Sequence, residues 1–316
     1  METLAQRLVA NPHDEEALTY AHRAGQQNPQ SYAILLEKVG TATPDTAIAA
    51  HWLGEAASVW SMTLGDAQQA ARVLLLALDK DPTQRNPFDR LTQMYREKGD
   101  TKALVTLLER QVKALTPLAY ERADVRSQLG AMHEELAKLF SDPAMFRPDR
   151  AVESWKRVVE LDPQNAYAIY AVRELLKQHQ QYGEALPYFG MEQAIVSDPQ
   201  RKLALFRDEV DVRRRARDLA GASQALRGAL ALQPDDVGVT QELALLIVER
   251  ISGGEPVPQP EREEAARLFV ALAELYDGEY GLSYARSALQ IAPGHDRAMQ
   301  LADHYGKQLG RTAELG

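Results

Sequence analysis

Apolar and polar positions along the chain alternate at helical spacing, and Gly, Asp and Pro residues interrupt this pattern at regular places. The stretch LGDAQQAARVLLLALDKDP, residues 64–82, has a Gly-Asp pair, a leucine-rich amphipathic run and a final Asp-Pro. Apolar residues three and four apart predict a helix with one buried face. We expect the glycine to end one helix, the aspartate to cap the next, and the proline to stop it because it lacks an N–H.

These interruptions recur at a nearly constant spacing. The Gly-Asp pair at 65–66 returns at 99–100, and Pro82 is followed by Pro117 at almost the same interval. Further prolines at 163, 199 and 234 are separated from one another by the same interval. A period of about 34 residues with two helices per unit indicates a stacked array, in which each unit completes the apolar face of its neighbour.

The second helix of several units shares one arrangement of small and large apolar residues. A small residue is followed four positions later by a large one, then by an apolar pair, and then by the proline. Small residues at helix crossings let two helices approach, while the large ones fill the groove between them. The matching positions are Ala70, Leu74, Ala77 and Leu78 before Pro82; Ala151, Trp155, Val158 and Val159 before Pro163; and Ala222, Leu226, Ala229 and Leu230 before Pro234.

The stretch NPFDRLTQMYREKGD forms the first helix of one unit. It has Phe88, Leu91, Tyr95 and Gly99 where the tetratricopeptide repeat has Trp, Leu, Tyr and its turn glycine. On all these residues the chain resembles the tetratricopeptide-repeat family over nearly its whole length. The resemblance implies an all-α protein, an α-solenoid of antiparallel helix pairs that forms a right-handed superhelix. First helices are expected near 45–63, 85–98, 118–140, 165–179, 200–216 and 262–276, and second helices near 29–40, 66–80, 101–114, 149–161, 183–197, 219–232 and 280–291.

Two units are longer than the period. The unit at 117–163 has a long first helix and a loop, SDPAMFRPDR. The stretch from Pro234 to Pro293 holds three helices and the Gly/Pro-rich sequence ISGGEPVPQPER, which is either a tolerated surface insertion or a hinge or docking loop. The predicted organisation is a repeat array at 1–250, a loop at 251–261 and C-terminal repeats at 262–316.

The last residues repeat the layout of an earlier unit. Gly310 follows Pro293 at the same distance at which Gly99 follows Pro82. By this alignment RTAELG, at 311–316, begins a second helix. We therefore expect a fragment of a longer array that is truncated within a repeat, because a natural end usually carries a polar capping helix. The N-terminus is also a short half-unit, for which a native start is an equally good explanation.

Composition restricts the classes of function. The chain of 316 residues is 45% hydrophobic and 26% charged, which is typical of a folded protein. A net charge of −9 disfavours nucleic acid and anionic membranes as partners. Without cysteine, disulfides and thiolate metal sites are excluded. The N-terminus lacks a secretory signal and the apolar runs are too short to span a membrane, which predicts a cytoplasmic protein without membrane insertion.

Catalytic motifs are not found. The sequence has no HExxH pair, no phosphate-binding glycine loop and no nucleophile elbow. His133 lies beside Glu134 and Glu135, but adjacent residues of a helix point in different directions. We predict a protein that is not an enzyme and that needs no metal or cofactor. The histidines are His13, His22, His51, His133, His179, His295 and His304.

One candidate binding site follows from the stretch DVRRRARD at 211–218. In the family that the chain resembles, certain first-helix positions line a concave groove that binds peptides or helices. Tyrosines beside arginines in this groove would suit an acidic or aromatic-bearing peptide, because Arg pairs with carboxylates and Tyr supplies rigid contact area. A solvated, internally paired helix face is the alternative. The candidate residues are Tyr167, Tyr170, Glu174, Lys177, Arg207, Asp211, Arg214 and Arg215.

The carboxylate clamp of chaperone-binding family members is not reproduced. That clamp needs Lys and Asn, where this chain has Tyr170 with Glu174 and Arg207 with Asp211. Chaperone-tail binding is therefore disfavoured.

A second candidate contact patch is Trp52 with Trp60, in the stretch TAIAAHWLGEAASVW. A place in the packed helix core is the other interpretation of these two rings.

The leading hypothesis for function is a non-catalytic scaffold that binds a partner protein or peptide in its helical groove and supports complex assembly. Two alternatives remain: a structural spacer or self-association module of a longer array, and a regulatory or targeting region of an enzyme encoded beyond residue 316. Repeat arrays share a scaffold while function lies in variable surface residues, so the sequence does not name the partner.

Overall fold

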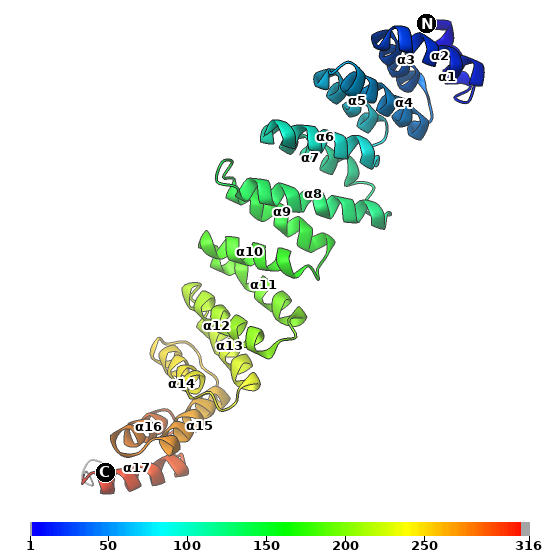
Figure 1. The fold of residues 1–316 in the computed structure, drawn as a ribbon. Coiled ribbons are helices and arrows are strands. Elements are labelled where there is room, and N and C mark those ends of the chain that lie inside the picture. Colours follow the sequence, from blue (N-terminus) through cyan, green and yellow to red (C-terminus); the bar gives the residue numbers. More distant parts are fainter. Residues whose placement is uncertain (1, 311–316) are drawn as a thin grey trace. The chain divides into compact units, whose positions relative to one another are not determined.

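The computed structural model describes residues 2–310, and the regular elements in this range are all helices (Figure 1). Within residues 2–162 and within residues 163–310, consecutive helices pack against each other and are joined by short turns. The predicted all-α architecture of antiparallel helix pairs is confirmed. The elements are α1 (Glu2–Ala10), α2 (Glu15–Gln27), α3 (Pro29–Ala42), α4 (Thr46–Ser58), the π-helical turn η1 (Val59–Thr63), α5 (Ala67–Lys80), α6 (Arg85–Lys98), α7 (Thr101–Leu115), α8 (Ala123–Ser141), α9 (Pro148–Leu161), α10 (Ala166–Gln178), α11 (Tyr182–Ile195), α12 (Pro199–Arg215), α13 (Leu219–Leu232), α14 (Val237–Ser252), α15 (Gln259–Leu275), α16 (Gly278–Ile291) and α17 (Asp296–Gln308).

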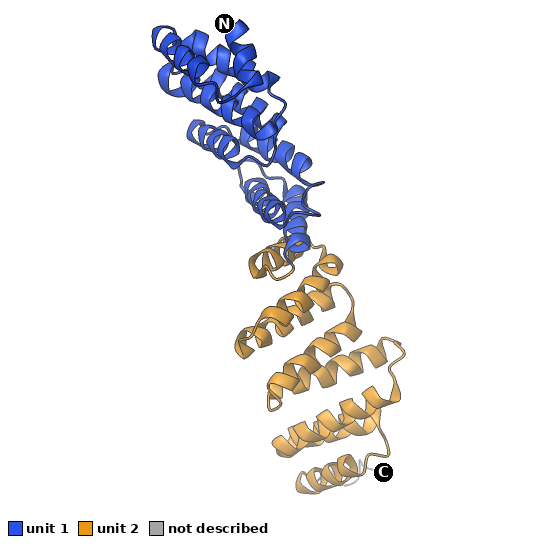
Figure 2. Ribbon diagram, turned by 90° about the vertical axis from the view of Figure 1, so that its right-hand side faces the viewer, with its two compact units in different colours: residues 1–162 blue, residues 163–316 orange. Residues whose placement is uncertain are grey.

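The chain divides into two compact units, at 1–162 and 163–316 (Figure 2). In unit 1, α4 pairs with α5, α6 with α7 and α8 with α9, and α1 to α3 pack at the N-terminal side. In unit 2, α10 pairs with α11, α12 with α13 and α15 with α16. Helix α14 lies in the chain between α13 and α15 and contacts both of them.

The Gly-Asp turns have the conformation that the sequence predicts. Gly65 and Gly99 have φ angles of 65° and 66°, which glycine adopts at little energetic cost. The carboxylates of Asp66 and Asp100 each accept a hydrogen bond of 2.9 Å, from the backbone N–H groups of Gln69 and Ala103. These bonds satisfy N–H groups that the first turn of a helix leaves unpaired, so both N-caps are confirmed.

The repeated apolar positions form the core of each unit. In α5, Ala70, Leu74 and Ala77 are completely buried. The rings of Trp52 and Trp60 are 7% and 8% exposed. The interpretation of these two tryptophans as core residues is confirmed, and a contact patch formed by exposed tryptophans is wrong. Both tryptophans belong to the apolar core that α3, α4 and α5 form.

The structure also shows elements that the sequence pattern did not resolve. The N-terminal segment before α3, expected to be a short half-unit, contains the two helices α1 and α2. The long first helix of the unit at 117–163 begins only at Ala123. The guanidinium of Arg126 donates hydrogen bonds to the carbonyl oxygens of Ala119 (3.3 Å) and Tyr120 (3.2 Å), which stabilises a turn before that helix.

The Gly/Pro-rich stretch forms a short loop at 253–258 between α14 and α15. Buried Arg250 anchors it, since its guanidinium lies 2.8 Å from Glu255 and 2.6 Å from Glu261. Val257, near the end of the loop, is buried in the apolar core. The loop is thus held by the ion pairs of Arg250 and by the burial of Val257. The predicted helix start at 311–316 lies outside the described residues.

Candidate functional site

The candidate residues lie on two first helices of unit 2. Tyr167, Tyr170, Glu174 and Lys177 belong to α10, and the other four belong to α12. Spacings of three and four residues place side chains on one side of a helix. Tyr167 and Tyr170 are 56% and 44% exposed. We call the surface made by these eight residues and Asp208 the α10–α12 face.

An ion pair that the sequence did not predict joins the two helices. The ammonium group of Lys177 lies 2.6 and 2.7 Å from the two carboxylate oxygens of Asp208, and 3.1 Å from Glu174. The Lys177 side chain is 21% exposed. Its position is therefore fixed by neighbours inside the protein.

A buried arginine lies beneath this pair. Arg173 is 4% exposed, and its guanidinium lies 3.0 Å from Glu192 of α11 and 2.8 Å from Glu174. It also pairs with Asp208 and lies 4.6 Å from the centre of the Phe189 ring. Glu192, at 1% exposure, is held by Arg173 and by Arg201 at 3.3 Å. Each buried charge has partners, which burial in a medium of low dielectric requires.

The three candidate arginines of α12 also have partners inside unit 2. Arg207 lies 2.7 Å from the carboxylate of Asp236, the N-cap of α14. Arg214 lies 3.5 Å from Glu249, and Arg215 lies 3.3 Å from the hydroxyl oxygen of Tyr182. The sequence alternative of an internally paired helix face therefore describes the free state of these side chains. Whether a partner binds here stays a prediction.

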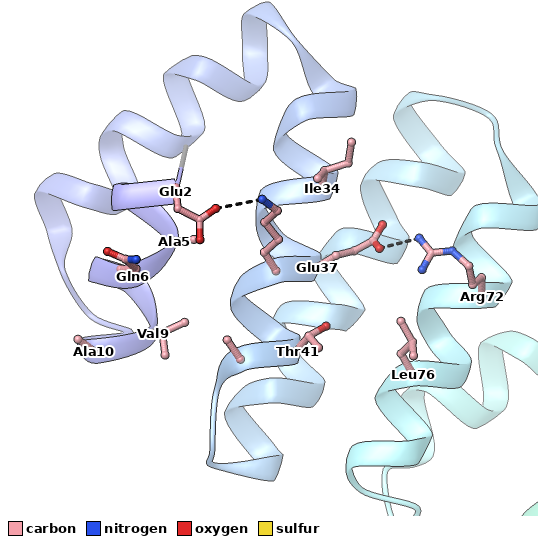
Figure 3. A pocket seen from close by; sticks show the side chains of 12 residues that line it. Glu2, Ala5, Gln6, Val9, Ala10, Ile34, Glu37, Thr41, Arg72 and Leu76 are labelled. Atoms are coloured by element: carbon pink, nitrogen blue, oxygen red, sulfur yellow. Dashed lines mark hydrogen bonds and ion pairs between the residues drawn. The ribbon is translucent and has the colours of Figure 1, made fainter.

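Unit 1 contains a groove that sequence reasoning missed. Between α1, α3 and α5 lies a cavity of about 690 Å³ (Figure 3). Val9, Ile34 and Leu76 supply apolar surface, and ion pairs cross it from Lys38 to Glu2 (3.1 Å) and from Arg72 to Glu37 (2.6 Å). The sequence feature that could have indicated this groove is an apolar residue on the exposed face of a helix, such as Ile34. The lining residues are Glu2, Ala5, Gln6, Val9, Ala10, Ile34, Glu37, Lys38, Thr41, Ala42, Arg72 and Leu76.

Two other kinds of site, metal centres and membrane-spanning helices, concern residues 2–310. No group of three or more His, Asp and Glu side chains within them is arranged to hold a metal ion. Among the helices of this same range, none combines the length and the apolar character needed to cross a membrane.

Comparisons with known proteins give likenesses of fold alone. No family model matches the chain, and no curated protein matches it. The C-terminal part of a TPR repeat-containing protein from Cytophaga hutchinsonii is 14% identical, with 75% of this chain and 97% of that chain covered, at a TM-score of 0.32. A tetratricopeptide repeat protein from Parabacteroides merdae is also 14% identical, covering 80% of this chain and 97% of that chain at a TM-score of 0.30.

A third structure is that of YrrB, described as a TPR protein with an unusual peptide-binding site. It is 19% identical, and 61% of this chain and 91% of that chain are covered at a TM-score of 0.32. The architecture rests on the chain itself, in which helical hairpins recur about every 34 residues with glycine-aspartate turns and buried alanines at the crossings. By these features the chain has the fold of a tetratricopeptide-repeat protein.

Proposed function

We propose that this protein is a non-catalytic interaction scaffold that binds a segment of a partner protein on the α10–α12 face and supports assembly of a complex. The observation that carries the proposal is the pair of exposed rings of Tyr167 and Tyr170 beside charged side chains held in place by ion pairs. Tyrosine is enriched at binding hot spots because it offers a large contact area and loses little conformational entropy. Preorganised neighbours reduce the ordering cost of binding.

The chemistry of the face favours a partner segment with carboxylates and an aromatic or apolar side chain. The Arg207 side chain is 57% exposed although it pairs with Asp236. Exposed ion pairs contribute about 0–1 kcal/mol, so a carboxylate of the partner can replace Asp236 with little loss of stability. Arg215 is also exposed on this face. Bidentate pairing of a guanidinium with a carboxylate then gives the complex its orientation.

Selection from a library of displayed random peptides tests this proposal with the full chain as bait. We expect enrichment of acidic peptides that contain an aromatic residue. Affinity for synthetic copies of these peptides should fall at least about tenfold in Tyr170→Ala and in Arg207→Gln, which corresponds to about 1.4 kcal/mol.

Tyr120→Ala is the matched control, because Tyr120 is 88% exposed and lies in unit 1. This variant should bind the selected peptides as the unchanged chain does. Peptides that bind Tyr170→Ala and Arg207→Gln with undiminished affinity would place the binding surface elsewhere and contradict the proposal.

A further inference from the structure

A second, aromatic-walled pocket lies in unit 1, apart from the groove between α1, α3 and α5. It has a volume of about 530 Å³ and is lined by residues of α2, by the loop before α2, by Tyr32 of α3 and by α4. This size is within the range of about 300–1,000 Å³ found for ligand pockets. The sequence pattern assigned neither Trp52 nor any histidine to a cavity.

Aromatic rings form two walls of this pocket. The hydroxyl group of Tyr32 shares a hydrogen bond of 3.1 Å with Nδ1 of His22, and their ring centres are 5.6 Å apart. His51 and Trp52 form the second pair, with ring centres 5.9 Å apart. Gly25 allows the Tyr32 ring to lie against α2, because a Cβ atom there would be 2.7 Å from that ring. Helix packing therefore brings rings from three helices around one space.

One carboxylate supplies the charge of the pocket. With neutral imidazoles, Glu55 carries the one charge among the described residues that line it. Within residues 2–310, the structure gives the Glu55 carboxylate no hydrogen bond and no ion pair. The nearest guanidinium, of Arg90, donates instead to the carbonyl oxygen of Gly54 and the hydroxyl of Ser58, both at 3.2 Å.

Two neighbouring groups respond to this carboxylate. Burial, together with the negative charge of Glu55, raises the pKa of Tyr32 above its ordinary value, so the phenol stays neutral at physiological pH. Burial lowers the pKa of Arg90, and the charge of Glu55 opposes this shift. Glu55 and Tyr32 line the same pocket. In addition, the buried indole N–H of Trp52 has no hydrogen-bond partner.

We propose that this pocket accepts a cationic side chain, arginine first and lysine second, from a partner polypeptide. A cation placed against aromatic faces gains about 0.5–2 kcal/mol, more as it is desolvated. The Glu55 carboxylate supplies the opposite charge that the chain itself does not neutralise. Arginine is preferred because its planar guanidinium stacks on rings and pairs with a carboxylate at the same time. An anion, by contrast, would meet the uncompensated charge of Glu55.

A neighbouring cavity gives the rest of the polypeptide a path. This further space, of about 250 Å³, shares Ala47, His51 and Glu55 with the first and extends to α6, where Asn86 and Arg90 line it. The side-chain amide of Asn can donate hydrogen bonds to a peptide backbone and accept them from it. The two cavities therefore suit consecutive residues of one extended segment that crosses α4. This site is separate from the α10–α12 face, and its occupant has the opposite charge.

Titration with single amino-acid derivatives tests the assignment on the full chain at pH 8, where imidazole is ordinarily neutral. The probes are N-acetylarginine amide, N-acetyllysine amide, N-acetylleucine amide and N-acetylglutamate. The observable is the indole N–H signal of Trp52 in ¹H–¹⁵N spectra, identified by its loss in Trp52→Phe. We expect a saturable shift with the arginine derivative, a weaker one with the lysine derivative and none with the other two.

Three variants complete the test. Glu55→Gln should weaken binding of the arginine derivative about fivefold, within the range of a cation–carboxylate contact at a partly exposed site. Ala47→Trp should fill the entrance and abolish the shift, since Ala47 is exposed and borders both cavities. Glu121→Gln, at an exposed position away from the pocket, is the control and should bind normally.

The proposal is overturned if the arginine derivative gives no saturable shift, if the leucine derivative gives the same shift, or if Glu55→Gln binds unchanged. Retention of the native circular dichroism spectrum shows that each variant is folded. Tyr170→Ala and Arg207→Gln lie in unit 2 and should leave this titration unaffected. Failure of one proposal is thereby distinguishable from failure of the other.

Discussion

Helices α3, α4 and α5 of unit 1 and helices α10, α11 and α12 of unit 2 pack in the same succession with different chemistry. In unit 1 the interior of these contacts is apolar, and Leu36, Leu53 and Leu74 are completely or almost completely buried. In unit 2, Arg173 and Glu192 lie inside the contact, at 4% and 1% exposure. The helical hairpin therefore tolerates either an apolar or an ionic interior, provided that every buried charge has a partner.

The outer surfaces differ in a related way. In unit 2, ion pairs such as that between Lys177 and Asp208 fill the space between neighbouring first helices. In unit 1, the corresponding space around α4 is hollow and contains the unpaired carboxylate of Glu55. A filled face offers rigid side chains to a partner, while a hollow face offers a cavity. One architecture can thus present two kinds of recognition surface.

The largest expected effect comes from breaking the ionic interior of unit 2. Arg173→Met removes the partner of a buried carboxylate, and we expect the free energy of unfolding to fall by about 3–5 kcal/mol. Urea denaturation measures the loss. Arg207→Met is the control, because its pair with Asp236 is exposed and should contribute about 1 kcal/mol or less. Equal losses in the two variants would contradict the prediction that the buried ion pair contributes more to stability than the exposed one.

A smaller effect is expected from the apolar contact of unit 1. A Cβ atom on Gly40 would lie 2.7 Å from Cγ of Leu53 and 3.0 Å from the carbonyl oxygen of Ala49. Gly40→Ala should therefore destabilise the protein by about 1–3 kcal/mol through overpacking. Gly54→Ala meets no atom within 4 Å and should stabilise it by up to about 1 kcal/mol, since alanine favours a helix. Thermal unfolding of both variants checks the sign, and a loss of stability in Gly54→Ala would refute this account of the α3–α4 contact.

The smallest expected effect is a pH dependence in unit 1, where His133 of α8 has a buried Nδ1 atom without a partner. Burial and the charge of Arg157 lower the pKa of His133 below its ordinary 6.5, while Glu153 and Glu160 oppose the shift. The unfolded chain then binds a proton more readily than the folded chain, so stability should fall as the pH drops below about 6.5. Comparing urea denaturation of the unchanged chain and of His133→Gln at pH 7.5 and 5.5 isolates this contribution. The variant should lose less stability on acidification, and an identical loss would exclude His133 as its source.

Local patterns predicted the fold because the features that define a helical hairpin lie close together in the chain. Asp66 caps a helix by bonding an N–H three residues away, and Gly65 ends the preceding helix by its own backbone angle. Even so, local pattern did not resolve α1 and α2 in the N-terminal segment or the delayed start of α8 at Ala123. At the start of α8, Arg126 donates hydrogen bonds to carbonyl oxygens six and seven residues earlier, which stabilises a turn in place of a helix. The periodicity of apolar residues does not predict such a contact.

The candidate site was predicted only in part, for a related reason. Helical spacing placed the candidate residues of α10 together, and likewise those of α12. It did not predict that Asp208 would hold Lys177 from 31 residues away, or that Asp236 would hold Arg207 from 29 residues away. Both partners lie about one repeat further along the chain, and the crossing of neighbouring helices decides which side chains meet.

By itself, the sequence determined most of the helical hairpins before residue 235, with their caps and their apolar core, because each depends on residues within one or two turns of the same helix. Tertiary structure alone decided which charges are neutralised and which stay available. Arg173 forms ion pairs with Glu192 and Asp208 because α11 and α12 pack close to α10. Within the described range, Glu55 has no cationic partner because the guanidinium of Arg90 donates its hydrogen bonds to Gly54 and Ser58. The physical reason is that ion pairs form between side chains of different helices that come within a few ångströms in the folded protein. The repeat pattern, by contrast, is set by residues that are close in the sequence.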